Sequence, residues 1–244
     1  MSADAALAAA PAEGWLTEPQ ARRLWAAGAR GRPAGAVVEI GSFRGRSTVV
    51  LALATGSVVA IDPHAGSDRG PQEIAPEASR GNADHEAFTT NLAAAGVSDR
   101  VRHVRKFSDA AHADVSGPLS LLYVDGAHRF GPARADVVDW GGRVEPGGTM
   151  LVHDAFSSIG VTFALLASCA GAREWRYIGR TGSLAEYSRR AVPATVAARV
   201  LDLGRHLVEL PWFARNVAIK ALVLAGRRSW AERLGLDPSA PWPY

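Results

Sequence analysis

Residues 36–48 combine an apolar run with a glycine loop that suits an anionic ligand. The run 36–40 is typical of a strand, the loop Gly41-Ser-Phe-Arg-Gly45 follows it, and a helical pattern begins directly after the loop. Such an arrangement brings a ligand against backbone N–H groups at a helix N-terminus, where the partial positive charge favours an anionic group. Glu39 in this strand and Asp62 at the end of the next are candidate partners for hydroxyl and ammonium groups.

Other side chains that can bind metal ions or transfer protons also follow apolar runs, at the points where the runs end. In an open parallel sheet a ligand lies beyond the carboxyl ends of the strands, so residues at those ends meet at one rim. The residues in such positions are Glu39 to Gly41, Asp62, Ser108 and Asp109, Asp125, and His153 and Asp154. The sequence therefore predicts one site at this rim.

The spacing of the glycines separates two classes of cofactor. Nicotinamide-dependent enzymes use Gly-x-Gly-x-x-Gly, which admits a pyrophosphate, whereas the loop from Gly41 to Gly45 keeps only two glycines. Asp62 stands 21 residues beyond Gly41, which suits a carboxylate at the tip of the next strand that accepts both ribose hydroxyls. The pattern favours a nucleoside cofactor without a pyrophosphate; a dehydrogenase, and an ordinary turn aspartate at position 62, stay open as alternatives.

Predicted strands and helices alternate along the chain and must position the residues of the rim. Apolar runs typical of strands buried on both faces alternate with helical patterns, which predicts a doubly wound, Rossmann-like, mostly parallel sheet. Two further strands, separated by a short loop, predict an antiparallel hairpin at the edge of a seven-stranded sheet. The expected strands are 36–40, 57–61, 101–107, 119–124, 149–153, 175–179 and 183–187, and the expected helices between them are 47–54, 83–95 and 132–144, the last closed by a turn at 145–148.

The chain divides into three parts around this sheet. Residues 1–30 are expected to form a disordered alanine-rich start and a cover helix capped by Thr17. Residues 31–190 are expected to form the cofactor-binding catalytic domain, with the Pro- and Gly-rich stretch 63–82 as a mobile lid. Residues 191–244 form a basic extension with two amphipathic helices that break at Pro211.

Three roles suit the extension: packing on the catalytic domain, a dimer seam, or peripheral membrane contact through an apolar face beside arginines. Residues 189–244 carry nine Arg or Lys against four Asp or Glu, while the whole chain has a net charge of +3. Because the basic excess lies in this tail and lacks interleaved aromatic residues, we do not expect a nucleic-acid partner. A homo-oligomer is expected.

Cysteine usage and hydropathy indicate the compartment. The single Cys169 excludes a disulfide framework, and its apolar neighbours predict a buried helical thiol. The N-terminus lacks the basic region and apolar core of a secretory signal, and no uncharged run reaches transmembrane length. We therefore expect a cytoplasmic protein, with peripheral contact at the inner membrane face left open.

Four motifs in this order resemble the class I S-adenosylmethionine-dependent methyltransferases. They are Val38 to Ser47, Ile61-Asp-Pro63, Tyr123-Val-Asp-Gly-Ala-His128, and Val144-Glu-Pro-Gly-Gly-Thr-Met-Leu-Val-His-Asp154. The resemblance covers residues 36–190. Within this class the chain is similar to the metal-dependent O-methyltransferases, and more closely to bacterial enzymes that methylate sugar hydroxyls of macrolides and mycobacterial polysaccharides.

The resemblance implies a role for each matching position. S-adenosyl-L-methionine would be bound at its methionine part by the glycine loop and its flanks, at its ribose by Asp62, and near its adenine by Ser108 and Asp109. Asp125 would serve both cofactor positioning and metal binding. The loop and flanking residues concerned are Glu39, Gly41, Ser42, Phe43, Gly45 and Ser47.

The metal set that the resemblance implies is Asp125, His153 and Asp154, and elementary geometry supports it, since neighbouring strand ends face one cavity. Oxygen ligands suit Mg²⁺. His153 departs from the related enzymes, which usually place a carboxylate there, and an imidazole moves the preference toward Mn²⁺, Fe²⁺ or Zn²⁺. Mg²⁺ or Mn²⁺ is expected, while a structural role for His153 stays open.

His128 is the expected general base, because a hydroxyl that attacks a methyl group must lose its proton and a neutral imidazole can take it near neutral pH. It stands three residues beyond Asp125, where a helix should begin. A capping or ion-paired histidine is the alternative. The predicted function is divalent-metal-assisted methylation of a hydroxyl on a sugar, a glycolipid precursor or a glycosylated natural product.

Two other functions stay open at this point. A methyltransferase for phenolic or other small-molecule hydroxyls would need aromatic walls around its acceptor, and the sequence does not show such walls. A cofactor-binding module without turnover, with the basic tail as its membrane- or partner-binding surface, is the alternative from another class.

Overall fold

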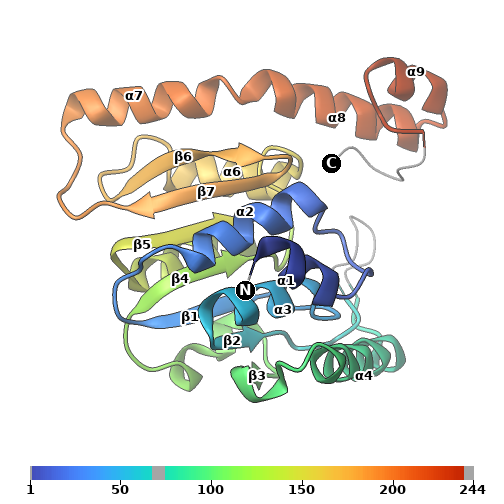
Figure 1. Ribbon diagram of the computed structural model, residues 1–244. Coiled ribbons are helices and arrows are strands. Elements are labelled where there is room, and N and C mark those ends of the chain that lie inside the picture. Colours follow the sequence, from blue (N-terminus) through green and yellow to red (C-terminus); the bar gives the residue numbers. More distant parts are fainter. Residues whose placement is uncertain (1, 68–74, 239–244) are drawn as a thin grey trace.

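The computed structural model describes residues 2–67 and 75–238 and contains a seven-stranded sheet in the order β3-β2-β1-β4-β5-β7-β6 (Figure 1). Five neighbouring strands, β3 to β5 in this order, are parallel, whereas β7 pairs antiparallel with both β5 and β6. The predicted mostly parallel sheet with an antiparallel edge hairpin is therefore confirmed. The strands are β1 Ala36–Ile40, β2 Val58–Ile61, β3 Val101–Val104, β4 Leu119–Val124, β5 Val144–Val152, β6 Trp175–Thr181 and β7 Leu184–Arg189.

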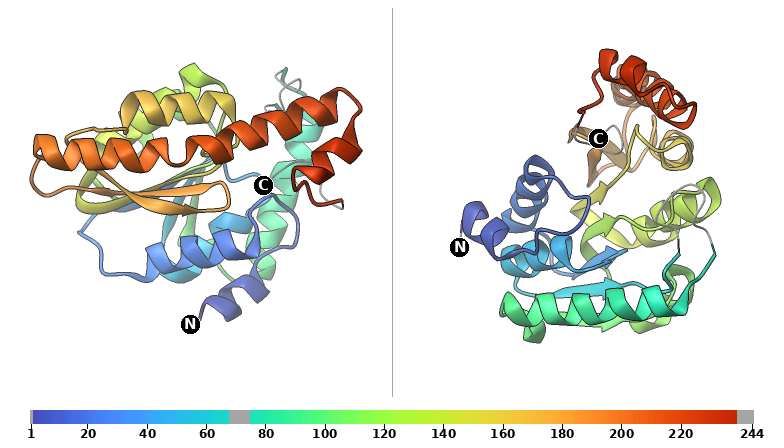
Figure 2. Two further views of the ribbon diagram at one scale, coloured as in Figure 1. Left: turned by 90° about the horizontal axis from the view of Figure 1, so that it is seen from above. Right: turned by 90° about the vertical axis from the view of Figure 1, so that its right-hand side faces the viewer.

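Helices cover both faces of the sheet (Figure 2). Three-residue 3-10 turns lie at Ser98–Arg100, Ser108–Ala110, His112–Asp114 and Gly141–Arg143, and a π-helix spans Asp136–Trp140. The helices are α1 Ala3–Ala9, α2 Glu18–Ala29, α3 Arg46–Thr55, α4 Ala78–Ala94, α5 Phe130–Ala135, α6 Ile159–Ser168, α7 Val196–Leu207, α8 Leu210–Leu224 and α9 Arg228–Arg233.

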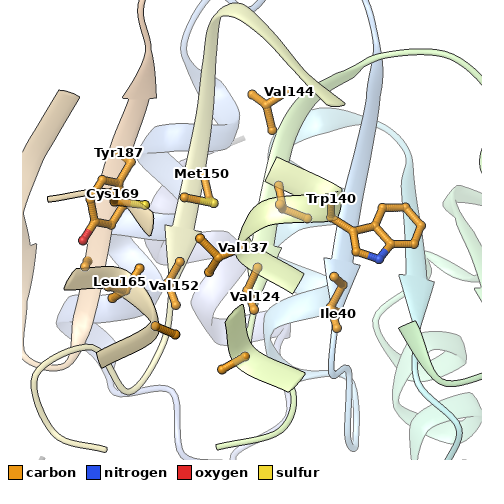
Figure 3. Packing of buried hydrophobic residues seen from close by; sticks show 14 of the residues in the cluster. Ile40, Val124, Val137, Trp140, Val144, Met150, Val152, Leu165, Cys169 and Tyr187 are labelled. Atoms are coloured by element: carbon orange, nitrogen blue, oxygen red, sulfur yellow. The ribbon is translucent and has the colours of Figure 1, made fainter. Parts of the chain in front are cut away.

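Two apolar layers fix the sheet between these helices. Successive strand residues point to opposite faces, so Leu122 and Val124 of β4 join the layer under α6 and the π-helix, while Leu121 and Tyr123 join the layer under α2, α3 and α4. Figure 3 shows the first layer, which includes the fully buried Trp140. Burial on both faces explains why the inner strands β1, β2 and β4 are almost continuously apolar.

The N-terminal region differs in part from expectation. Thr17 caps α2 as predicted and forms a capping box with Gln20, whose side chain accepts from the Thr17 N–H at 2.8 Å. The alanine-rich start, however, is helical rather than disordered: Ser2 caps α1, and the alanines that follow are strong helix formers. Ala6 of this helix is fully buried, so packing against α2 and α3 adds to that propensity.

Several predicted element boundaries inside the catalytic domain differ from the structure. The expected helix 132–144 is divided into α5, the π-helix and a 3-10 turn, and the residues 145–148 expected to close it lie within β5, whose pairing with β4 is irregular at this end. Proline is tolerated at such irregular strand ends. The stretch 63–82, predicted as a lid, includes residues 68–74 outside the described structure, and its end from Ala78 belongs to α4.

The C-terminal extension forms a rod along the edge of the molecule, where α7 and α8 follow one another beside β6, β7 and α6 (Figure 1). The two helices break at Val208 and Glu209, just before the predicted position, because Pro211 sits in the first turn of α8. There it needs no N–H partner. Among the described residues no helix is both long and apolar enough to span a bilayer.

Candidate active site

The glycine loop between β1 and α3 is held by a carboxylate from β2. Asp62 Oδ2 accepts the backbone N–H groups of Ser42 at 2.9 Å and Phe43 at 2.8 Å, and Oδ1 accepts the N–H of His64 at 2.7 Å. Gly41 has φ of 84°, in the left-handed region that glycine adopts without strain. A Cβ there would also lie 2.1 Å from the Asp125 carbonyl oxygen, so this glycine lets β1 and β4 end side by side.

Glu39 lies behind the loop and is completely buried. Its carboxylate accepts the hydroxyl of Ser47 and, at 2.6 Å, the hydroxyl of Thr48, both in the first turn of α3. Burial raises the pKa of Glu39 to about 8, although these two hydroxyl groups oppose the shift. In this arrangement Glu39 joins β1 to the helix that follows the loop.

A cavity of about 960 Å³ opens at the carboxyl ends of the strands, next to the point where the strand order reverses between β1 and β4. Its walls bring together most residues predicted at this rim: Gly41, Phe43, Asp62, Ser108, Asp109, Asp125, His128, His153 and Asp154. The other predicted cofactor residues, Glu39, Ser42, Gly45 and Ser47, are not among the lining residues in the described part of the chain. Their roles stay predictions.

Two carboxylates and two histidines converge on one wall of this cavity. His128 Nε2 lies 2.7 Å from Asp154 Oδ2, and His153 Nδ1 lies 3.2 Å from Asp125 Oδ1 and 3.5 Å from Asp154 Oδ2. Tyr123 donates its hydroxyl to Asp125 Oδ2 at 2.9 Å. The segments that follow β4 and β5 supply these groups, as the register Val124 to Val152 requires.

The backbone around His128 is fixed by close packing. A Cβ on Gly160, in the first turn of α6, would lie 2.2 Å from the His128 carbonyl oxygen. Ser158, the residue that caps α6, donates its hydroxyl to the same carbonyl at 3.3 Å. The start of α6 therefore sets where the imidazole stands relative to Asp154.

The electrostatics of this wall reflect opposed charges at short range. Burial alone would raise the pKa of the Asp154 carboxyl, but His153 and His128 hold that pKa well below its usual value. Burial likewise opposes charge on His128, yet the hydrogen bond to Asp154 and the charges of Asp154 and Asp125 keep the pKa of His128 above its usual value. Asp154 is therefore ionised at neutral pH.

The donor atoms of this wall fit a divalent cation. The described residues Asp125, His128 and Asp154 each offer a ligand atom, all within 4.8 Å of one another. His153 Nδ1 is buried without a well-formed hydrogen bond, although carboxylate oxygens lie nearby. The carboxylates suit Mg²⁺ or Mn²⁺, and each imidazole that binds moves the preference toward Mn²⁺, Fe²⁺ or Zn²⁺. The structure thus adds His128 to the predicted candidate ligands.

Some lining residues had not been predicted from the sequence. Asp136, buried on the π-helix, accepts the hydroxyl of Ser108 at 2.5 Å, and burial raises its pKa to about 6. Its position in a helical pattern gave no signal. Trp15 and Phe107 line the cavity, and the Trp15 ring lies 4.8 Å from that of Phe43, so the aromatic walls that the sequence did not show are present.

The extension also reaches the cavity. One side of α8 lines it with Val217, Lys220, Ala221 and Leu224, and Lys220 donates to the Ser157 carbonyl oxygen at 2.8 Å. Packing on the catalytic domain is therefore one role of the extension. Sequence periodicity predicted this helix but not which side of the domain it would cover.

Part of the chain matches a family of known proteins. Residues 38–155 match the family model described as a methyltransferase domain. The chain contains a methyltransferase domain. This stretch runs from β1 to just beyond β5 and includes the glycine loop, Asp62 and the wall of carboxylates and histidines. The prediction of a class I S-adenosylmethionine-dependent methyltransferase is confirmed at the level of this domain.

Solved structures share the fold of this methyltransferase at low sequence identity. The O-methyltransferase NovP is 18% identical, with a TM-score of 0.56 over 72% of this chain and 83% of its own. TomG of Streptomyces achromogenes, an O-methyltransferase involved in tomaymycin synthesis and solved with S-adenosylmethionine, is 20% identical, with a TM-score of 0.51 over 78% and 89%. Cofactor-bound Rv0187 from MTB is 22% identical, with a TM-score of 0.51 over 77% and 87%.

Proposed function

We propose that this methyltransferase transfers the methyl group of S-adenosylmethionine to a hydroxyl of a sugar, a glycolipid precursor or a glycosylated natural product. The observation that carries the proposal is the cavity wall on which Asp125, His128 and Asp154 meet, beside a loop that suits a nucleoside cofactor. The volume of about 960 Å³ is at the upper end of the range for small-molecule sites. It leaves room for an acceptor beside the donor.

The residues of this wall have separate tasks in the proposed reaction. S-adenosylmethionine, when bound, supplies a methyl group that is already activated as part of a sulfonium. The chain's own contribution is alignment and proton removal, because displacement at carbon needs the attacking oxygen in line and near 3 Å. Asp62 and the glycine loop hold the donor side, whereas Asp125, His128 and Asp154 face the acceptor side.

His128 is proposed to take the proton of the hydroxyl at Nδ1. Its Nε2 lies 2.7 Å from Asp154 Oδ2, so an Nε2–H donates to that carboxylate and leaves Nδ1 as the basic atom. Asp154 orients the imidazole and stabilises it once it is protonated, the arrangement found in acid–base dyads. A divalent cation held by Asp125 and Asp154, with His153, would lower the pKa of a bound hydroxyl.

A phenolic hydroxyl is the second candidate acceptor. Trp15, Phe43 and Phe107 give the cavity aromatic walls, which a planar acceptor requires and which the sequence alone did not reveal. Aromatic faces pack favourably at ring-centroid distances of about 4.5–7 Å. The two acceptor classes are separated by a paired screen of glycosides and phenols.

Calorimetric titration with S-adenosylmethionine and its demethylated product, with and without Mg²⁺ or Mn²⁺, tests the proposal first. We expect both nucleosides to bind, and the ion to add its own binding heat that Asp154→Asn removes. A screen of hydroxyl acceptors then measures formation of the demethylated product. Absence of nucleoside binding would overturn the cofactor, and turnover that is unaffected by chelation would overturn the role of the cation. The expected homo-oligomer and cytoplasmic location stay predictions.

A further inference from the structure

The helix α7 has its polar side turned inward and its apolar side turned outward. Asp202 and His206 are its buried residues, with exposed fractions of 2% and 0%. The exposed fractions of Val196, Leu201 and Val208 are 74%, 68% and 73%. An ordinary surface helix has the opposite arrangement. Figures 1 and 2 show that this helix runs along the outer edge of the molecule.

The inward polar contacts fix the rotation of α7. Asp202 pairs with Arg190 and, at 3.3 Å, with Arg205. His206 lies 2.7 Å from the Asp202 carbonyl oxygen through Nδ1 and 3.2 Å from the Tyr187 hydroxyl through Nε2. Turning the helix to bury its apolar side would break these contacts and leave buried polar groups unpaired, which is costly. The outward apolar face is therefore built into the fold.

This face, which we call the α7 face, is continuous and wide. At 3.6 residues per turn its members occupy neighbouring positions around the helix. They are Val196, Val200, Leu201, Leu203, Leu207 and Val208, all at least 41% exposed. A face wider than the narrow seam of a coiled coil, on a helix that carries basic residues, is typical of helices that lie in the membrane interface.

The charges beside the α7 face point to an anionic surface. Arg199 and Arg205 lie on its two flanks, and the acid of this helix, Asp202, is buried and shared between Arg190 and Arg205, so a positive excess remains. A second copy of the chain docked through the same face would bring arginines against arginines, without an exposed carboxylate of α7 to balance them. Anionic lipid headgroups complement these arginines.

We infer that this methyltransferase binds peripherally to anionic lipid surfaces through the α7 face. The rod continues into α8, where Leu224 is exposed and lines the catalytic cavity. Docking of α7 would therefore anchor the rod whose other helix lines the cavity. This favours an acceptor carried on a lipid, a point that rests on the function proposed above, whereas lipid binding itself does not.

Vesicle co-sedimentation of the full chain tests the inference. We expect binding to vesicles of phosphatidylcholine with phosphatidylglycerol, weaker binding to phosphatidylcholine alone, and weakening by salt, which screens the arginines. The double variant Leu201→Ser, Val208→Ser should lower the partition coefficient by about tenfold or more, because each side chain contributes apolar area to the bilayer. Phe163→Ser, at a half-exposed phenylalanine on α6, is the matched control and should bind like the wild type.

Two further measurements keep the outcome clear. Thermal unfolding and calorimetric binding of S-adenosylmethionine check that the double variant is folded. Vesicle co-sedimentation needs no methyl acceptor, so failure of the proposed function does not affect it. Equal binding by the wild type and the double variant, or no binding to anionic vesicles, would overturn the inference. A dimer in analytical ultracentrifugation that the double variant dissociates would instead assign the α7 face to a second copy.

Discussion

Gly41 packs directly against the carbonyl group of Asp125, so the donor-binding loop and the wall of carboxylates share one backbone contact. A Cβ at position 41 would lie 2.1 Å from that oxygen, and the φ of 84° disfavours any other residue. Neither strand end can move aside without disturbing the site. The geometry of the two halves of the cavity is therefore coupled at this glycine.

Gly41→Ala should consequently destabilise the fold and abolish donor binding. We expect a loss of more than about 3 kcal/mol in the free energy of unfolding, from strain together with the clash. Gly56→Ala is the control, because φ there is 88° but no atom lies within 4 Å of the added Cβ. It should cost only about 1–2 kcal/mol. Chemical denaturation measures both; equal losses would show that the contact with Asp125 is unimportant.

His128→Ala should separate catalysis from binding. We expect turnover to fall by about two or more orders of magnitude, because a general base is removed, while the affinity for S-adenosylmethionine is nearly unchanged. His85→Ala is the control, since His85 is not among the described residues that line the cavity. Steady-state kinetics and calorimetry measure the two quantities. Retained turnover in the His128 variant would refute the assignment of the base.

Removal of divalent cations should suppress turnover, and Mg²⁺ or Mn²⁺ should restore it. Asp154→Asn should have the same effect as the chelator without unfolding the protein, because the amide keeps the shape but loses the charge that binds the ion. Titration of the chelated enzyme with each ion gives the affinity. Full activity in the presence of chelator would contradict the metal model.

Asp62→Ala should weaken donor binding. The carboxylate holds two N–H groups of the glycine loop and is the predicted partner of the ribose hydroxyls, so its loss removes the support of the loop as well as a direct contact. We expect the dissociation constant for S-adenosylmethionine to rise about a hundredfold, since hydrogen bonds to a charged group contribute about 1.5–3 kcal/mol each. Asp99→Ala, in an exposed turn, is the control.

Glu39 should make stability fall as pH rises. Its pKa in the fold is about 8, above the ordinary value of 4.5, so between these values the folded state holds a proton that the unfolded state has released. The free energy of unfolding then decreases with pH across this window, by about 1.4 kcal/mol per pH unit at most from this group. Glu39→Gln should remove that dependence, and its stability relative to the wild type should grow from pH 5 to pH 8 and then level off. A difference independent of pH, measured by denaturation, would contradict the buried protonated state.

Local sequence was sufficient for the sheet and for much of the site. Short apolar or β-branched runs identified the five parallel strands, and a short loop between two further runs identified the hairpin of β6 and β7. The positions of Asp62, Asp125 and Asp154 at strand ends then placed them at one rim without any knowledge of distances. The predicted ends of helices were wrong where the helical periodicity of the sequence continued through a change of helix type. The π-helix that contains Asp136 is the example.

Contacts between segments that are distant in the chain could not be predicted from local sequence patterns. The pairing of His128 with Asp154 depends on how the segments after β4 and β5 approach, which the start of α6 decides. The aromatic wall from Trp15 and the reach of Lys220 into the cavity depend on where terminal segments pack. None of these leaves a periodic signal in the sequence.

The amino-acid sequence by itself determined the individual strands, the glycine loop and the set of carboxylates. These features depend on spacing and hydrophobic periodicity, which act over a few residues. The tertiary structure decided which of these groups touch and which side of α7 faces outward. The periodicity of an amphipathic helix shows that it has an apolar side but not what that side meets. In α7 the buried Asp202 and His206 settle that question, since paired polar groups hold the helix from within.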